Sequence, residues 1–239
     1  RAGAGSITAV LPYLAYARQD RADVGEGLGL AWAGDLLRAS GVDRVVSIDV
    51  HSEGATEILG LPLASLSPAR AFAAALPPGW TAEDVTFIAP DEGAIGRCRA
   101  LAGAVSSARP IAVLSKRRSG AGVAHTDLHG EVTRRGVIVD DILDTGATLL
   151  SCCRLLAAHG ALELGVAVTH AVLTGTEWRG LWSSGVTRLW VTDTLPPSRA
   201  RAAGAEIVPV APLLAPLLLG RSTESPGGQL RMRAAAGGT

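Results

Sequence analysis

Three acidic residues crowd together where an apolar run ends. Asp140, Asp141 and Asp144 follow Val137–Val139 in the stretch VIVDDILDTGATL. Their carboxylates repel one another unless a cation or a hydroxyl-rich ligand lies between them. The neighbouring hydroxyls of a sugar donate well to ionised carboxylates, and Mg²⁺ prefers oxygen ligands. The stretch therefore predicts a sugar-binding site that Mg²⁺ can complete.

The residues after these acids are suited to hold a phosphate. They are Thr145, Gly146, Ala147 and Thr148. They would turn the chain from a strand into a helix, whose first backbone N–H groups point outward and bind anions. The alternative is purely structural, with Asp144 or Thr145 capping the helix and the neighbouring acids solvated. The spacing alone leaves both interpretations open.

The elements that would position these residues follow from the apolar pattern. Short runs rich in β-branched residues predict strands at Ile7–Pro12, Arg44–Val50, Val85–Pro90, Pro110–Ser115, Gly136–Asp141, Leu164–His170 and Thr187–Asp193. Apolar residues at helical spacing predict helices at Gly27–Ser40, Gly93–Ala104 and Gly146–Gly160. This alternation predicts an α/β fold with parallel sheets, in which ligands bind beyond the carboxyl ends of the strands.

That rule identifies further candidates at strand ends. His51 follows one predicted strand and Asp91 another, so a shared ligand could lie there. The only lysine, Lys116, follows a third. A histidine satisfied within the structure and a solvated basic turn are the alternatives. The segment Arg117–Arg135 is polar and lacks periodicity, so we expect a mobile active-site loop, with a disordered linker as the alternative.

The composition narrows the class of protein. Lys+Arg and Asp+Glu are equal at 22 each, which gives no reason to expect a nucleic-acid or membrane partner. No apolar run approaches the roughly 18 residues of a spanning helix. Cys98, Cys152 and Cys153 are odd in number and lack metal-ligand spacing, which favours buried thiols in a reducing cytoplasm.

Five stretches together carry a family resemblance. VIVDDILDTGATL resembles the phosphoribosyl-diphosphate-binding motif of type I phosphoribosyltransferases and of ribose-phosphate diphosphokinases. The other four are LPYLAYARQDR, VDRVVSIDVHS, APDEGAIGRCRALA and AVLSKRRSG. They are similar to segments of the diphosphokinases and occur in that family's order, whereas a phosphoribosyltransferase has no reason to combine RQDR, DVH and KRR. The resemblance runs from Ser6 to about Leu219.

The resemblance implies two phosphoribosyltransferase-like parallel-sheet domains, the first incomplete. Met232 is the only methionine, so Arg1 is not a translational start, and we expect an N-terminal part to be lacking. Residues 1–66 would be the remainder of an N-terminal ATP-side domain, with 211–225 packing back on it. Residues 67–210 would bind ribose phosphate, and 226–239 would form a flexible tail. The family also implies a homo-oligomer.

The implied reaction transfers the diphosphoryl group of ATP to the C1 hydroxyl of ribose 5-phosphate, giving 5-phosphoribosyl 1-diphosphate and AMP. The alternative is a catalytically impaired or truncated homologue that binds nucleotide or sugar phosphate and acts as an associated subunit. Family roles carry over to matching positions. They are Lys116 and Arg118 for catalysis; Arg18, Gln19 and His51 for ATP; Asp140, Asp141, Asp144, Thr145, Gly146, Ala147 and Thr148 for ribose 5-phosphate; and His51 and Asp91 for Mg²⁺.

Overall fold

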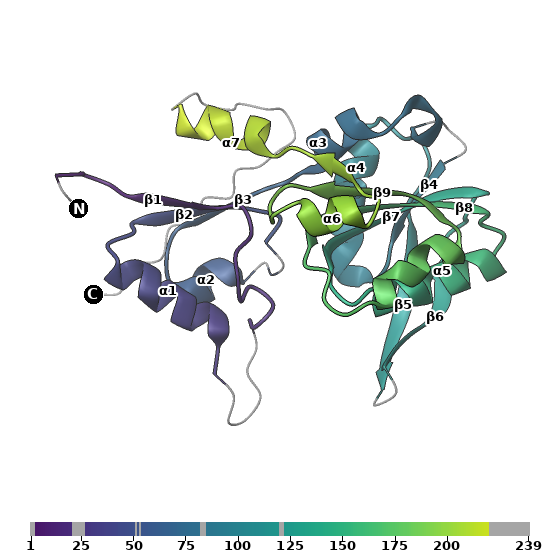
Figure 1. The fold of residues 1–239 in the computed structure, drawn as a ribbon, viewed down its shortest axis with the longest axis horizontal. Helices are drawn as coiled ribbons and strands as arrows, with labels where there is room; N and C mark the ends of the chain where they lie inside the picture. Colours follow the sequence, from purple (N-terminus) through teal and green to yellow (C-terminus); the bar gives the residue numbers. More distant parts are fainter. Residues whose placement is uncertain are drawn as a thin grey trace. The chain divides into compact units, whose positions relative to one another are not determined.

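The chain forms two compact units. The computed structural model describes residues 3–20, 27–50, 52, 54–81, 85–119 and 122–219. One unit is Arg1–Ser67 with Ala215–Thr239, and the other is Pro68–Leu214 (Figure 1). Helix α7, Ala211–Leu218, spans the division between them.

The first unit is built on a three-stranded parallel sheet in the order β1-β2-β3. Its strands are Thr8–Leu11, Arg44–Ile48 and Leu63–Leu66. Parallel neighbours need crossovers, which here contain α1, Gly29–Ala39, and α2, Ala55–Leu59. A Cβ on Gly34 of α1 would lie 1.9 Å from the Leu59 carbonyl oxygen, so the glycine permits the close approach of α1 and α2. Leu30 and Leu59 are fully buried in the resulting core.

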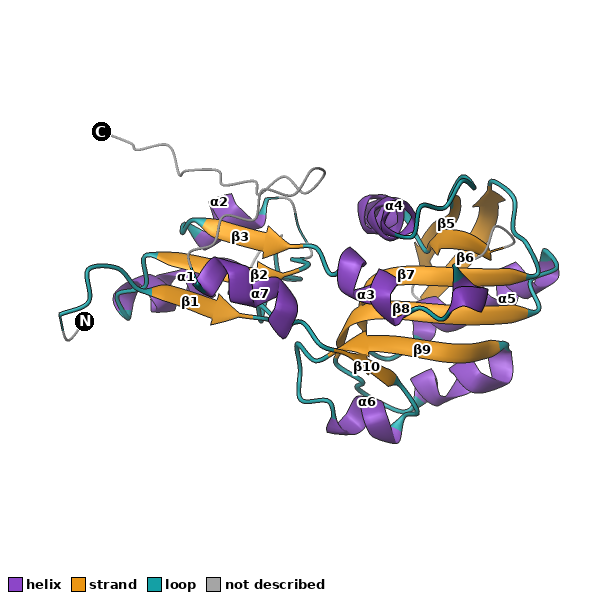
Figure 2. Cartoon of the chain, turned by 90° about the horizontal axis from the view of Figure 1, so that it is seen from above, coloured by secondary structure: helices purple, strands orange, loops and turns teal. Residues whose placement is uncertain are grey.

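The second unit contains a seven-stranded sheet in the order β10-β9-β8-β7-β4-β5-β6 (Figure 2). The strands are β4 Val85–Ala89, β5 Ala112–Ser119, β6 Gly122–His129, β7 Arg135–Leu143, β8 Glu163–Ala171, β9 Val186–Thr192 and β10 Glu206–Val208. Neighbouring strands are parallel except β5 and β6, which form an antiparallel hairpin. The helices are α3 Ala69–Ala75, α4 Ile95–Ala104, α5 Ala147–Ala158 and α6 Ser198–Ala202, with 3₁₀ turns η1 Pro78–Trp80, η2 Glu92–Ala94 and η3 Glu177–Ser184.

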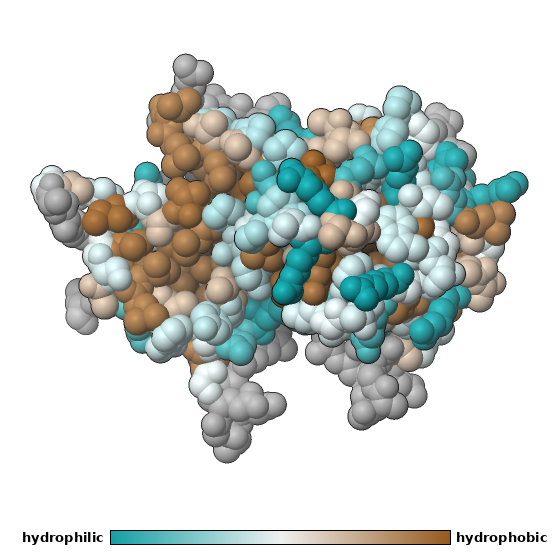
Figure 3. Space-filling view, viewed as in Figure 1, coloured by the Kyte–Doolittle hydropathy of each residue, from teal (hydrophilic) through white to brown (hydrophobic). Residues whose placement is uncertain are grey.

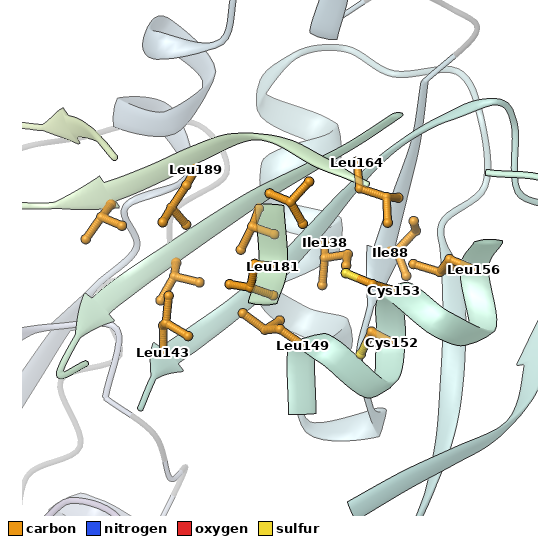
Figure 4. Packing of buried hydrophobic residues seen from close by; sticks show 14 of the residues in the cluster. Ile88, Ile138, Leu143, Leu149, Cys152, Cys153, Leu156, Leu164, Leu181 and Leu189 are labelled. Carbon is orange, nitrogen blue, oxygen red and sulfur yellow. The ribbon is translucent and has the colours of Figure 1, made fainter. Parts of the chain in front are cut away.

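This sheet contributes to two apolar cores. Ile138 packs with Leu149, Cys152 and Cys153 of α5 (Figure 4). Its neighbours on β7, Val137 and Val139, belong to the other core with residues of α3 and α4. A strand buried on both faces has a continuous apolar sequence, which is why Val137–Val139 could be predicted as part of a strand.

All seven predicted strands and all three predicted helices form, and the predicted α/β class is confirmed. Three strands were missed, namely β3, β6 and β10. The expected loop over Arg117–Arg135 was wrong for residues 117–119, 122–129 and 135, which lie in β5, β6 and β7. β5 and β6 pair with each other and gain backbone hydrogen bonds that local composition does not reveal. β7 also continues past Asp141 to Leu143, where Ile142 and Leu143 pair with β8.

The three cysteines are buried and free, as expected. Burial raises the pKa of Cys98 and of Cys153 to about 12, so both thiols stay protonated and serve packing. Among the described residues, no helix has the length and apolar character needed to cross a bilayer.

Candidate active site

The candidate site lies at the carboxyl ends of adjacent strands in the second unit. β7, β4 and β5 are neighbours in the sheet. Asp140 and Asp141 lie near the end of β7, Asp91 follows β4, and Lys116 lies on β5. The sheet order therefore brings together residues that are up to 50 positions apart in the sequence.

Lys116 and Asp91 form an ion pair. The Lys116 ammonium donates to Asp91 Oδ2, and about a quarter of each side chain is exposed. Asp91 Oδ1 accepts the Ala94 N–H at 3.1 Å, so the same carboxylate caps η2. Burial raises the pKa of Asp91, but Lys116, the Ala94 N–H and Arg97 outweigh burial and hold this pKa below its ordinary value. Asp91 is therefore an anion that keeps the lysine at the site.

Arg97 links the two groups of acids and was not singled out from the sequence. A guanidinium nitrogen lies 3.4 Å from Asp141 Oδ2, with 14% and 7% of the two side chains exposed. Its positive charge helps to lower the pKa of Asp91 and partly opposes the rise in the pKa of Asp140. Nothing in the local pattern distinguishes Arg97 from Arg99, two residues later on α4, so only the fold reveals this role.

The repulsion expected between the acids is present in the pair Asp140 and Asp141. Asp141 is buried, and Asp140 Oδ1 accepts the Asp141 N–H at 2.9 Å. Burial and then the charge of Asp141 raise the pKa of Asp140 well above its ordinary value, although Arg97 opposes them. The pair therefore resists carrying two full negative charges, and a ligand that donates hydrogen bonds would favour full ionisation.

The predicted phosphate loop turns as expected at Gly146. This residue has φ +92°, and α5 begins directly after it at Ala147. Helix starts leave their first N–H groups without acceptors inside the helix, and these groups can hold an anion. The alternative, a cap by Asp144 or Thr145, is not the N-cap found: the N-cap of α5 is Gly146, which has no side chain, although Thr145 Oγ1 accepts the Ala147 N–H at 3.3 Å. Thr148 lies in the first turn of α5.

The segment after β8 holds Asp144 through Thr174, which follows a residue in a strained backbone conformation. Leu173 is buried and has φ +54°, a backbone region that bulky side chains rarely adopt. The Leu143 carbonyl accepts two N–H groups, from Val172 at 2.9 Å and from Leu173 at 3.0 Å. The next residue, Thr174, donates its hydroxyl to Asp144. Thr174 gave no signal in the sequence, because this contact joins β7 to the segment after β8.

Two predicted residues belong to the first unit. Arg18 and Gln19 are exposed on the turn after β1. Gln19 packs against the start of α1, since a Cβ on Gly29 would lie 2.0 Å from Gln19 Oε1. Their place in a common site with the second unit stays a prediction.

His51 lies outside the described residues, and so does the side chain of Arg118, whose backbone lies on β5. The described part of the chain contains no cluster of three His, Cys, Asp or Glu side chains able to hold a metal ion. Asp91 is thus the described member of the predicted metal pair.

Known proteins match nearly the whole chain. Residues 70–192 match the phosphoribosyl transferase domain family, and residues 1–41 match the N-terminal domain of ribose phosphate pyrophosphokinase. A ribose-phosphate pyrophosphokinase from Caldanaerobacter subterraneus subsp. tengcongensis is 34% identical over 223 residues, which are 92% of this chain and 70% of that protein. One from Caulobacter vibrioides is 36% identical, over 90% of this chain and 70% of that protein.

A solved structure agrees with these sequence matches. The crystal structure of phosphoribosylpyrophosphate synthetase from Mycobacterium smegmatis superposes with a TM-score of 0.78 at 29% identity. The match covers 91% of this chain and 72% of the other. By sequence and by fold, the chain belongs to the ribose-phosphate pyrophosphokinase family, the diphosphokinases that its motifs resemble.

Proposed function

We infer that this chain transfers the diphosphoryl group of ATP to the C1 hydroxyl of ribose 5-phosphate, giving 5-phosphoribosyl 1-diphosphate and AMP. Family membership supports the reaction. The observation that carries it is the ion pair of Lys116 on β5 with Asp91, which follows β4, the strand between β5 and the strand β7 that bears Asp140 and Asp141. A cation for phosphates and acids for sugar hydroxyls thus occupy one edge of one sheet.

In this mechanism the C1 hydroxyl oxygen attacks the β-phosphorus of ATP and releases its proton to solvent. The bond from that phosphorus to the oxygen that bridges it to the α-phosphorus breaks, and that oxygen leaves with AMP. Such a transfer depends on alignment and on cations that neutralise the phosphate oxygens. Lys116 exchanges Asp91 for a phosphate oxygen, and Arg118 adds a second cation. A compact ammonium concentrates its charge on one oxygen, which suits the single lysine of the chain.

Ribose 5-phosphate binds along the end of β7 and the start of α5. Asp140, Asp141 and Asp144 accept hydrogen bonds from the sugar hydroxyls. The 5-phosphate receives the N–H groups and hydroxyls of the segment Thr145–Thr148. Thr174 keeps Asp144 oriented through its hydrogen bond.

Mg²⁺ is the proposed cofactor, and Asp91 and His51 are the residues that would hold it. The lowered pKa of Asp91 keeps its oxygens ionised. Mg²⁺ is commonly held by one or two carboxylates together with substrate phosphates, so a set this small is sufficient. The bound ion would neutralise phosphate charge. Arg18 and Gln19 contact ATP in this scheme, since a guanidinium suits phosphates and an amide suits adenine.

We also propose a cytoplasmic homo-oligomer. Apolar residues gather on one face of the first unit (Figure 3). Leu28 at the N-cap of α1, and Trp32 and Leu36 within this helix, are spaced by four residues and are 36%, 54% and 48% exposed. Residues at this spacing share one helix face, and exposed apolar stripes favour association. Size-exclusion chromatography with light scattering measures the mass of the assembly. A mass equal to that of the monomer at all protein concentrations would contradict the homo-oligomer.

The decisive experiment measures AMP release by the purified full chain. We expect AMP only when ATP, ribose 5-phosphate and Mg²⁺ are all present. A phosphoribosyltransferase would instead consume 5-phosphoribosyl 1-diphosphate and need no ATP. Ribose 5-phosphate binding without AMP release would refute catalysis and favour a non-catalytic subunit.

A further inference from the structure

His125 is a buried histidine that the proposed chemistry does not use. It lies on β6, and its cross-strand partner on β5 is Lys116. The register of the hairpin shifts between Ser115 and Lys116. Irregularities of this kind re-aim side chains and weaken the local ladder. His125 is opposite the first residue after the irregularity, where the strand pairing is weakened.

The His125 ring contacts the end of a different strand. Its Nε2 lies 2.8 Å from the carbonyl oxygen of Pro90, the residue before Asp91. A carbonyl can only accept, so Nε2 carries the proton and donates. Burial lowers the pKa of His125, which favours the neutral ring with its proton on Nε2.

Helix α5 holds the same residue from another side. The His125 N–H donates to Ser151 Oγ at 2.9 Å. Cys152 Sγ lies 3.5 Å from Nε2 and 3.7 Å from Nδ1. Both partners lie on the helix whose first turn follows the predicted phosphate loop. The sequence between Lys116 and Asp140 gave no indication of these contacts, because they are all long-range.

These contacts close a ring around Lys116. β5 pairs with β6 at His125, His125 donates to Pro90, Pro90 is bonded to Asp91, and Asp91 is paired with Lys116. We propose that His125 is a positioning residue, which clamps the β5–β6 hairpin onto the end of β4 and onto α5 so that the Lys116 ammonium stays at the carboxyl edge of the sheet. The inference rests on the proposed role of Lys116 in diphosphoryl transfer.

Two amide substitutions test the hydrogen bond to Pro90. In His125→Gln an amide NH₂ can stand near the position of Nε2, whereas the shorter amide of His125→Asn cannot reach the Pro90 oxygen. His129→Asn is the matched control, since His129 is exposed on the same strand and its Nε2 lies 2.9 Å from Ser115 Oγ. We expect His125→Asn to lower kcat about 10- to 100-fold with KM values nearly unchanged, because small displacements of a positioned group cost this much. His125→Gln should keep most of the activity, and His129→Asn all of it.

Hydrogen exchange gives a second readout that does not need catalysis. Backbone amides of 112–119 and 124–129 should exchange faster in His125→Asn than in the parent, and at the parent rate in His125→Gln and His129→Asn. If the parent makes no AMP, the proposed function fails, yet the exchange still tests the clamp. Equal kcat and equal exchange in His125→Asn and the parent would overturn the inference. So would a His125→Gln chain as impaired as His125→Asn. If His125→Asn fails to fold, His125→Gln decides the question. Faster hydrogen exchange of its β5–β6 amides would refute the positioning role of His125, and exchange at the parent rate would support it.

Discussion

The Lys116 ammonium and the Asp91 carboxylate satisfy each other within the fold. If Lys116 stabilises the transferring group, its removal should affect turnover more than binding. Lys116→Ala should lower kcat about 100- to 1000-fold, the usual cost of losing one group that stabilises transition-state charge. The KM for ATP should change much less. Steady-state AMP release at saturating ribose 5-phosphate measures both quantities.

The conservative change Lys116→Arg separates charge from shape. A planar guanidinium spreads its charge and cannot reproduce a compact ammonium, so we expect only partial recovery of kcat. Equal losses in kcat and in ATP affinity in Lys116→Ala would argue against a transition-state role. Lys116→Ala also removes the ion pair of Asp91, so the unfolding temperature of this variant should be measured beside its kinetics.

Asp140 should make stability depend on pH in the direction opposite to that of most acids. Its pKa is raised from 3.8 by burial and then by Asp141. Below pH 3.8 both the folded and the unfolded chain hold the proton, and the contribution of Asp140 is fully present. As the pH rises toward the folded pKa, the unfolded chain ionises first, and this contribution is lost. Asp140→Asn cannot ionise and should therefore be more stable than the parent at neutral pH.

Denaturant titrations at several pH values measure this difference. The gain in Asp140→Asn should shrink as the pH falls toward 3.8, and affinity for ribose 5-phosphate should decrease at every pH. Asp127→Asn, at an exposed position on β6, is the control for the loss of a carboxylate elsewhere in the same unit. A parent that is more stable than Asp140→Asn at neutral pH would contradict a raised pKa.

At the scale of elements, the junction of β7 and α5 depends on one glycine. Gly146 has φ +92°, and a Cβ there would lie 2.6 Å from the Trp178 Cα atom of η3. Gly160, after the end of α5, has φ +91° with nothing within 4 Å of its Cβ position. Both alanine substitutions incur the left-handed backbone cost of about 1–2 kcal/mol. Only Gly146→Ala must also push η3 away, which adds about 1–3 kcal/mol.

Unfolding and binding measurements distinguish the two glycine variants. Gly146→Ala should lose more free energy of unfolding than Gly160→Ala and should bind ribose 5-phosphate more weakly. Gly160→Ala should bind it normally. Similar stability and affinity in the two variants would mean that the close approach of η3 does not shape the phosphate loop.

Local pattern sufficed for part of the fold and of the site. β7 and α5 carry a continuous apolar run, a glycine at the turn and helical spacing, so VIVDDILDTGATL revealed both elements and the acids between them. β6 was missed because its pairing with β5 compensates a polar sequence. Arg97 and Thr174 were missed because each acts on a residue of another element. Such partners depend on sheet order and on strained turns, which no short window encodes.

At the scale of the molecule, each unit has its own apolar core. One core lies within the first unit and contains Leu30, whereas Leu156 belongs to a core of the second. Both leucines are fully buried, and truncation of such a residue to alanine costs about 2–5 kcal/mol. We expect Leu30→Ala to lower the unfolding temperature of the first unit and Leu156→Ala that of the second.

Scanning calorimetry with limited proteolysis assigns each transition to a unit. Two separable transitions, each shifted by one variant, are expected when units unfold independently. A single transition shifted equally by both variants would show that the chain unfolds as one cooperative body.

The contact of Trp178 with Gly146 offers an optical signal from the phosphate loop. The indole Nε1 donates to the Gly175 carbonyl at 3.2 Å, and the Arg179 guanidinium lies 5.3 Å from the ring centroid. A phosphate that settled at the start of α5 would change the electric field around this indole and hence its fluorescence. The other four tryptophans, Trp32, Trp80, Trp182 and Trp190, supply the background, which Trp178→Phe retains. Quenching or enhancement on titration, absent in Trp178→Phe, would report sugar-phosphate occupancy without an attached dye.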